Sequence, residues 1–124
     1  MSESSFARQP AWTRDAVFYQ VFVERFANGR PEIDPEGVLP WGSEPSRAGF
    51  TGGDLRGIEQ HLDHVVELGA NALYLTPIFE ADTNHRYDTA DYGRIDHRLG
   101  DLDDFRSLLR AAHDRSLRVV LDGV

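Results

Sequence analysis

Residues 54–75 read Asp-Leu-Arg-Gly-Ile-Glu-Gln-His-Leu-Asp-His-Val-Val-Glu-Leu-Gly-Ala-Asn-Ala-Leu-Tyr-Leu, and this stretch decides the fold. Apolar residues recur in it at steps of three and four, which predicts an amphipathic helix whose buried stripe is Leu55, Ile58, Leu62, Val65 and Leu68. Asp54 suits the N-cap of this helix, and Gly69 suits the position just after its end. The apolar residues 72–75 then predict a short buried strand. A helix that leads directly into a buried strand indicates an α/β fold.

The same alternation extends in both directions from this stretch. Residues 16–23 are almost all apolar and rich in β-branched and aromatic types, which predicts a strand buried on both faces. A second helical stripe begins after Asp101, and residues 118–121 predict a third buried strand. The order strand, helix, strand, helix, strand implies right-handed crossovers and a parallel sheet.

The two long polar loops of the chain both follow strands. Residues 24–53 contain four of the six prolines, and residues 78–100 are rich in Asp, Asn, His, Tyr and Arg, whereas the helix-to-strand turns at 69–71 and 116–117 are short. In (β/α)8 barrels the loops after the strands build the active face, and the opposite loops are short. Because three strands cannot close a barrel, two interpretations stay open. One is a small open βαβαβ sheet, and the other is the first part of a longer barrel that is cut after its third strand.

Composition and charge argue against several classes of function. The 13 basic and 21 acidic residues give a net charge of −8, which disfavours binding to nucleic acid or to an anionic membrane. No apolar run approaches the roughly 18 residues of a membrane span. The first residues show no basic or apolar region of a secretory signal, so we expect a cytoplasmic protein. Cysteine and lysine are absent, and no G-x-G-x-x-G pattern follows the first strand, which disfavours thiolate sites, phosphate loops and a free-standing nucleotide-binding domain.

Two groups of polar residues have the composition of a functional site. His61 and His64 are three apart on the first helix and could share a metal ion, but they lie off the apolar stripe, which favours a solvated face. Residues 84–92 read Asn-His-Arg-Tyr-Asp-Thr-Ala-Asp-Tyr. Aromatic faces that stack on C–H patches, beside polar groups that bind hydroxyls, suit a sugar. The same residues equally suit a structured loop whose Asp and Asn side chains cap its own turns.

Three groups of motifs, taken in order, resemble one known family. They are Val-Phe-Tyr-Gln-Val-Phe-Val-Glu-Arg-Phe at 17–26, Gly-Gly-Asp-Leu-Arg-Gly-Ile at 52–58, and Leu-Thr-Pro-Ile-Phe at 75–79 followed by His-Arg-Tyr-Asp-Thr-Ala-Asp-Tyr at 85–92. They resemble the α-amylase family, glycoside hydrolase family 13, and within it the neopullulanase, cyclomaltodextrinase and maltogenic amylase group. Asp-Gly-Val at 122–124 resembles the start of the family's first conserved region, Asp-x-Val-x-Asn-His.

The resemblance implies a fold and a set of substrate-binding residues. Residues 15–124 would form the N-terminal part of a (β/α)8 TIM barrel, with about three strands and two helices, after a leader at 1–14. Tyr87 matches the tyrosine that stacks on the sugar at the cleavage subsite, and His85 matches a histidine beside the same subsite. Asp122 matches an aspartate that helps to hold the site together.

The activity that the resemblance implies is retaining hydrolysis of α-glucosidic bonds in an α-glucan or maltooligosaccharide. The family's nucleophile and acid/base glutamate come from later strands, so we assign no catalytic residue to this chain and expect the chain alone to be inactive. Asp88 and Asp91 are expected to be structural or to orient the substrate. Transglycosylation through the same covalent intermediate is one alternative function, and a non-catalytic carbohydrate-binding barrel is another.

The resemblance also implies a Ca²⁺ site, which some relatives hold between the first long loop and the Gly-Gly-Asp turn. The positions that match its ligands are Asn28, Asp34, Gly52 and Asp54. Oxygen ligands of this kind suit a hard cation. Arg30 and Ile33 stand where relatives carry an acidic and an amide residue, which should weaken the site. The alternative is that Asp54 serves only as a helix N-cap.

Overall fold

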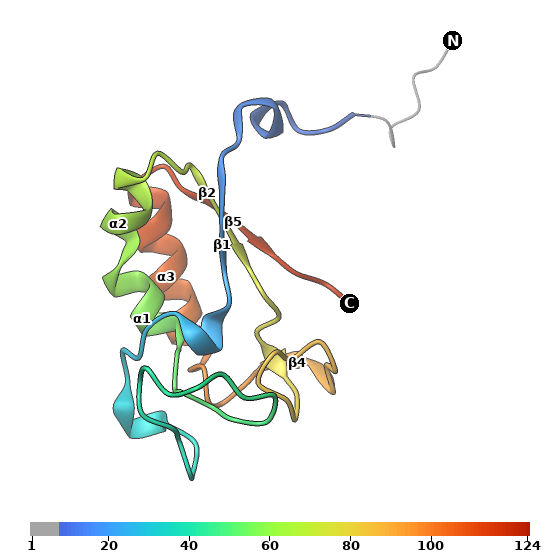
Figure 1. The fold of residues 1–124 in the computed structure, drawn as a ribbon. Coiled ribbons are helices and arrows are strands. Elements are labelled where there is room, and N and C mark those ends of the chain that lie inside the picture. The colour runs from blue at the N-terminus through green and yellow to red at the C-terminus, as the bar shows by residue number, and fades with distance from the viewer. Residues whose placement is uncertain (1–7) are drawn as a thin grey trace.

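The computed structural model describes residues 8–124 and contains a parallel sheet of three strands with helices on one side (Figure 1). The strands are β1 (Phe18–Val21), β2 (Ala72–Leu75) and β5 (Arg118–Leu121), in the spatial order β1-β2-β5. The helices are α1 (Leu55–Gln60), α2 (Leu62–Glu67) and α3 (Leu102–Asp114). The predicted order of elements and the parallel pairing are therefore confirmed.

The strands pair in register, and this alignment gives the sheet two different faces. The face that packs against the helices consists of Tyr19, Leu73 and Val119 in one row, and Val21, Leu75 and Leu121 in the next. The opposite face consists of Phe18, Ala72 and Arg118, followed by Gln20, Tyr74 and Val120. Phe18 is 48% exposed, so the prediction of a first strand buried on both faces is wrong. The reason is that the helices among residues 8–124 cover one side of the sheet only.

The two predicted helix starts are confirmed by their caps. Asp54 caps α1 by accepting a hydrogen bond from Gly57 N, and Asp101 forms a reciprocal capping box with Asp104 at the start of α3. Gly69 follows α2 with φ +90°, a conformation that glycine adopts without steric cost.

The helix predicted over the first apolar stripe is interrupted at His61. The Nδ1 atom of His61 lies 2.8 Å from the carbonyl oxygen of Gly57, which an uninterrupted helix would use for the backbone N–H of residue 61. That N–H donates instead to Ile58 O at 3.0 Å, so the chain turns more tightly there. His61 and His64 are both exposed, which confirms that they lie off the buried stripe. Leu68 was predicted to belong to that stripe, but it follows the end of α2 and is 58% exposed.

Both long loops contain local structure that the sequence analysis missed. The first loop holds short 3₁₀ turns at Val23–Arg25 and Pro31–Ile33. The second holds an antiparallel pair, β3 (Phe79–Glu80) and β4 (Asp91–Ile95). The predicted leader at 1–14 runs into a 3₁₀ turn at Ala11–Asp15, and its residues 1–7 lie outside the described residues.

The hydrophobic core lies between the sheet and the helices. Its fully buried members include Leu55, Ile58, Leu62, Val65, Leu73, Leu75, Leu108 and Ala112. Burial of one such leucine, isoleucine or valine contributes about 1.5–3 kcal/mol to the stability of the fold. This core therefore fixes the helices against the sheet. No helix within residues 8–124 is long and apolar enough to cross a bilayer.

Candidate functional site

Each long loop follows a strand, and all three strands are parallel. Both loops therefore start at the carboxyl ends of the strands, which together form one edge of the sheet (Figure 1). At this edge the hydroxyl of Tyr87 donates a hydrogen bond to the carboxylate of Asp122. Asp122 follows β5 directly, and its backbone N–H donates to Leu75 O at 3.0 Å. The structure thus brings together two predicted site residues that are 35 positions apart. Their role toward a sugar stays a prediction.

His85 stands beside Tyr87 on the exposed surface of the second loop. The two ring centroids lie 5.8 Å apart, and the backbone N–H of Tyr87 donates to His85 Nδ1 at 3.0 Å. Because Nδ1 accepts this bond, we assign the proton of the neutral imidazole to Nε2. Tyr87 is 41% exposed. The pair therefore presents an aromatic surface and an N–H donor to the solvent.

Tyr74 belongs to the same group, and the sequence analysis missed it. A hydrogen bond with Asp122 raises the pKa of Tyr74, so Asp122 serves two phenols. The hydrogen bond with Asp122 also raises the pKa of Tyr87, to about 12. Both tyrosines therefore remain protonated donors at neutral pH. The sequence does carry a sign of this role. Side chains alternate along a strand, so Tyr74 lies on the face opposite Leu73 and Leu75, and its hydroxyl stands out in the apolar run 72–75.

The acidic residues of the second loop stabilise its own turns. The hydroxyl of Thr83 donates to Asp88, and this bond lowers the pKa of Asp88. Asp91 Oδ1 accepts from Gly93 N at 2.8 Å. The expected self-capping of the loop is therefore found at Asp88 and Asp91. His85 and Tyr87 face outward, and the interpretation of this loop as a sugar site stays a prediction.

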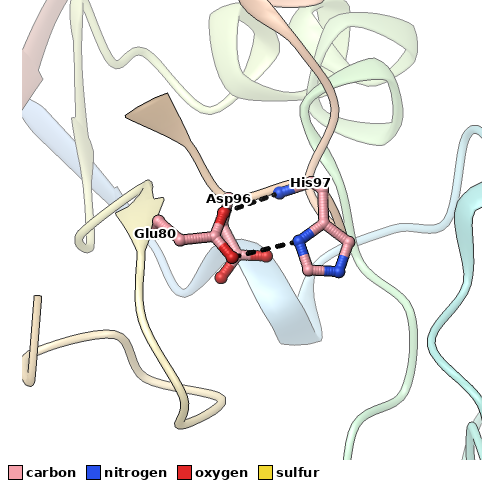
Figure 2. A group of neighbouring side chains, drawn as sticks. All are labelled: Glu80, Asp96 and His97. Atoms are coloured by element: carbon pink, nitrogen blue, oxygen red, sulfur yellow. Dashed lines mark hydrogen bonds and ion pairs between the residues drawn. The ribbon is translucent and has the colours of Figure 1, made fainter. Parts of the chain in front are cut away.

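Glu80, Asp96 and His97 form a group of potential metal ligands within the described part of the chain (Figure 2). His97 Nδ1 lies 3.1 Å from Glu80 Oε1. The carboxylate of Asp96 already has two arginine partners. Arg98 donates to it twice, from Nε to Oδ1 at 3.0 Å and from Nη2 to Oδ2 at 2.8 Å. Arg86 Nε lies 3.0 Å from the same Oδ2. Two guanidinium groups on one carboxylate would repel a metal ion, so Asp96 serves as the partner of Arg86 and Arg98.

Two of the residues predicted to bind Ca²⁺ form a close pair in the first loop. Asn28 Nδ2 donates to both carboxylate oxygens of Asp34, at 2.8 and 2.9 Å. A Cβ at Gly52 would lie 2.7 Å from Asp34 Oδ1, so glycine alone fits there. Asn28 Oδ1 is buried without a hydrogen-bond partner among residues 8–124. The unpartnered Asn28 Oδ1 offers one oxygen ligand to a hard cation, while the Asp34 carboxylate accepts from the amide nitrogen of the same residue.

Asp54, the remaining predicted ligand, is engaged with the backbone. Its Oδ1 accepts from Gly57 N at 2.7 Å and Gly29 N at 2.9 Å, and its Oδ2 accepts from Arg30 N at 2.8 Å. Burial raises the pKa of Asp54, against these hydrogen bonds. Its N-cap role is confirmed, and its role as a ligand stays a prediction.

The side chain of Arg30, expected to oppose a cation, turns toward other carboxylates. It pairs with Asp104 of α3 and lies 3.0 Å from Glu32 Oε1. Its positive charge is therefore balanced by Asp104 and Glu32.

Comparison with known proteins identifies the family. The family model of the α-amylase catalytic domain matches residues 20–124. The chain belongs to the α-amylase family. Structures of other family enzymes match the chain over nine-tenths of its length, so the three-stranded sheet is the N-terminal part of a TIM barrel. Of the two interpretations of the sheet, the barrel is confirmed.

Three relatives show how close this likeness is. A cyclomaltodextrinase from Bacillus sp is 56% identical over 116 residues, which are 93% of this chain and 21% of the relative. The intracellular maltogenic amylase of Bacillus subtilis is 49% identical over 123 residues, or 98% of this chain and 21% of the relative. The ligand-free cyclic α-maltosyl-(1→6)-maltose hydrolase from Arthrobacter globiformis superposes with a TM-score of 0.91 at 63% identity, covering 93% of this chain and 26% of that one. The chain thus spans about a fifth to a quarter of the length of these α-amylase relatives.

Proposed function

We propose that the full-length protein hydrolyses α-glucosidic bonds in maltooligosaccharides or related α-glucans with retention of configuration. The observation that carries this proposal is the bond between Tyr87 and Asp122 at the edge of the sheet where the strands end. In (β/α)8 enzymes that edge is the active face. The relatives named above include a cyclomaltodextrinase and a cyclic α-maltosyl-(1→6)-maltose hydrolase, which supports an α-glucan as the ligand.

The described residues would bind and orient the sugar. The exposed ring of Tyr87 offers a face for the C–H groups of a glucosyl unit, and His85 Nε2 offers a donor to a hydroxyl. Asp122 holds the phenol of Tyr87 in place through its carboxylate.

No catalytic pair is assigned within these residues. Retaining hydrolysis needs a nucleophile and an acid about 5–5.5 Å apart. Beside Tyr87, Asp88 is engaged by Thr83 and Asp122 by the two phenols. We therefore propose that these carboxylates do not perform the bond cleavage and that the 124-residue polypeptide alone is inactive.

A depression next to His85 has room for further sugar units. Its volume is about 550 Å³, and it is lined by Phe22, Arg25, residues 45–47, Asn84 and His85. Phe22 is exposed, and Arg25 Cζ lies 5.9 Å from the centre of its ring. An aromatic surface with convergent polar groups is typical of a small-molecule site.

Product analysis of the full-length protein tests this proposal. Purified protein is incubated with maltotriose and with a cyclomaltodextrin, and the anomeric protons of the first products are followed by NMR. Release of the α-anomer supports retaining hydrolysis, whereas the β-anomer contradicts it. Longer oligosaccharides as the main products would indicate transglycosylation. Binding of maltotriose without any product would indicate a non-catalytic barrel.

Two further properties are proposed for the full-length protein. Asn28, Asp34 and Gly52 would hold a Ca²⁺ ion, supported by the unpartnered Asn28 Oδ1. Such an ion would stiffen the first loop by binding oxygen ligands, and it would supply no chemistry to the sugar. A cytoplasmic location is also proposed, supported by the name of the intracellular B. subtilis relative.

A further inference from the structure

The second loop alternates between buried and exposed side chains at the position where it presents the candidate sugar site. Asn84 and Arg86 are buried, while His85 and Tyr87 are exposed. Arg86 is only 1% exposed and has φ +62°, in the left-handed region. A buried cation and a left-handed non-glycine residue each cost free energy, so the surroundings must hold Arg86 there.

Two buried carboxylates, one in the first loop and one near the end of the second, lie beside the guanidinium of Arg86. Its Nε lies 3.0 Å from Asp96 Oδ2, and its Nη1 lies 3.9 Å from Glu24 Oε2. The same Nη1 donates to Asn84 O at 2.8 Å. Glu24 is fixed in turn, because its Oε1 accepts from Thr51 N and from Gly52 N. Arg86 therefore joins this part of the second loop to the end of the same loop at Asp96 and to the first loop at Glu24.

The charges around Arg86 are balanced. Arg98 binds Asp96 from the other side, so two guanidinium groups face the two carboxylates of Asp96 and Glu24. The ring of Phe50 lies beside both cations, 5.8 Å from Arg86 Cζ and 4.5 Å from Arg98 Cζ. Among residues 8–124, Nη1 of Arg86 donates a hydrogen bond to Asn84 O, whereas Nε and Nη2 are buried without a hydrogen-bond partner, so charge pairing and the contact with Phe50 hold the guanidinium. A lysine ammonium would keep the charge and lose this planar group.

The backbone of Arg86 also sets the direction of its neighbours. Its N–H donates to Thr83 Oγ1 at 3.2 Å, and its carbonyl accepts from Thr89 Oγ1 at 3.1 Å. With the side chain pointing inward and φ positive, the residues on either side emerge together, and their rings lie 5.8 Å apart.

We propose that Arg86 is the positioning residue of the sugar-binding loop. Its guanidinium, fixed between Asp96 and Glu24, sets where Tyr87 and His85 stand, and so determines whether Tyr87 reaches Asp122. This inference rests on the proposed function for its effect on sugars. Its effect on Tyr87 does not, because that contact exists without a ligand.

The test uses the full-length protein with 3-fluorotyrosine at position 87, so that one ¹⁹F resonance reports the titration of this phenol. The fluorine lowers the pKa of the phenol and brings the titration into a range where the protein stays folded. Arg86→Lys keeps the charge and loses the planar guanidinium, while Arg86→Gly keeps the backbone conformation and loses the side chain. Both should lower the titration midpoint by about one pH unit, because Tyr87 leaves Asp122.

One control separates positioning from general damage. Arg106→Lys changes an exposed arginine of α3 that contacts neither Asp96 nor Glu24, and it should leave the midpoint unchanged. An unchanged midpoint in both Arg86 variants, or an equal shift in Arg106→Lys, would overturn the proposal. If the Arg86 variants fail to fold, Glu24→Gln is measured instead. It should lower the midpoint too, and an unchanged midpoint would overturn the proposal.

Kinetics with maltotriose then connect the loop to function. In Arg86→Lys we expect kcat/KM to fall about tenfold or more, chiefly through KM, because the stacking ring is misplaced. A normal kcat/KM together with a shifted ¹⁹F midpoint would overturn the link to the sugar. If the wild-type protein cleaves no glucan, the proposed function fails, and the ¹⁹F titration still tests Arg86.

Discussion

Arg56 Nε donates to Asp104 Oδ1 at 2.7 Å and thereby joins α1 to α3. Asp104 is buried and also accepts from Arg30, which extends the connection to the first long loop. One carboxylate thus holds three segments together at the side of the sheet where the helices lie.

Replacing Asp104 with alanine should lower the free energy of unfolding by about 2 kcal/mol or more, because two arginines lose their shared partner and α3 loses half of its capping box. Chemical denaturation of the purified protein measures the change. Asp103→Ala is the matched control, since Asp103 is exposed and its contact with Arg106 is 3.9 Å long. Equal effects of the two variants would contradict the prediction.

Acid should weaken the fold through the same carboxylate. Burial alone would raise the pKa of Asp104, but hydrogen bonds from Arg56, Asp101 N–H and Arg30 lower it overall. A depressed pKa in the folded state adds stability above the unfolded value of about 3.9, and this stability is lost as the pH falls through the folded value. Asp104→Asn should therefore flatten the loss of stability below about pH 4, measured by thermal unfolding across pH. If Asp104→Asn lost stability below this pH as steeply as the wild-type protein, Asp104 would not be the group responsible.

The ring and the hydroxyl of Tyr87 should contribute separately. Tyr87→Ala removes the stacking surface and should lower kcat/KM of the full-length protein for maltotriose by about tenfold or more. Tyr87→Phe keeps the ring and loses the bond to Asp122, so its effect should be smaller. Tyr92→Phe removes a hydroxyl that binds Val124 and serves as the control. Wild-type kinetics in Tyr87→Ala would remove Tyr87 from the site.

Tyr74 should affect activity only through its hydrogen bond with Asp122. Tyr74→Phe removes one of the two phenols on this carboxylate and should lower kcat/KM a few-fold, or by about 1 kcal/mol in transition-state binding. The Tyr74→Phe/Asp122→Asn double variant should be no worse than Asp122→Asn alone. Additive losses would show that Tyr74 acts by another route.

Calcium should stabilise the first loop. At ten times its dissociation constant, Ca²⁺ would add about 1.4 kcal/mol to the free energy of unfolding. The melting temperature of the full-length protein in EDTA and in millimolar Ca²⁺ measures this effect. Asp34→Asn should abolish the difference. Identical melting temperatures in the wild-type protein would show that Asn28 and Asp34 hold no cation.

The order of elements was predictable because the hydrophobic period changes sharply inside residues 54–75. The caps at Asp54 and Asp101 were predictable for a similar reason, since a short acidic side chain before an apolar stripe has few other local roles. The pair β3–β4 was missed because residues 91–95 are nearly all exposed and show no alternation of apolar side chains. The break at His61 depends on one side-chain bond to Gly57, which no periodic pattern reports.

The site was predictable only in part. Motifs named His85, Tyr87 and Asp122, and the structure brings these residues to one edge of the sheet. The place of Tyr74 in the site could be recognised only from the strand register, because a tyrosine within an apolar run suggests a core residue. Arg86 stands in a polar loop, where an arginine is expected to face water. Its burial depends on carboxylates at positions 24 and 96, which are close only after folding.

The amide of Asn84 donates to the carbonyl oxygens of Arg47 and Gly49 at 3.1 and 2.8 Å, so the tip of the second loop is fastened to the first. We expect the two loops to open together, so amide hydrogens in both whose exchange requires this opening should share one opening free energy. The same fastening constrains how the protein can diverge. A deletion or insertion near residue 47 alters the support under Tyr87, so length changes in one loop must be accompanied by compensating changes in the other.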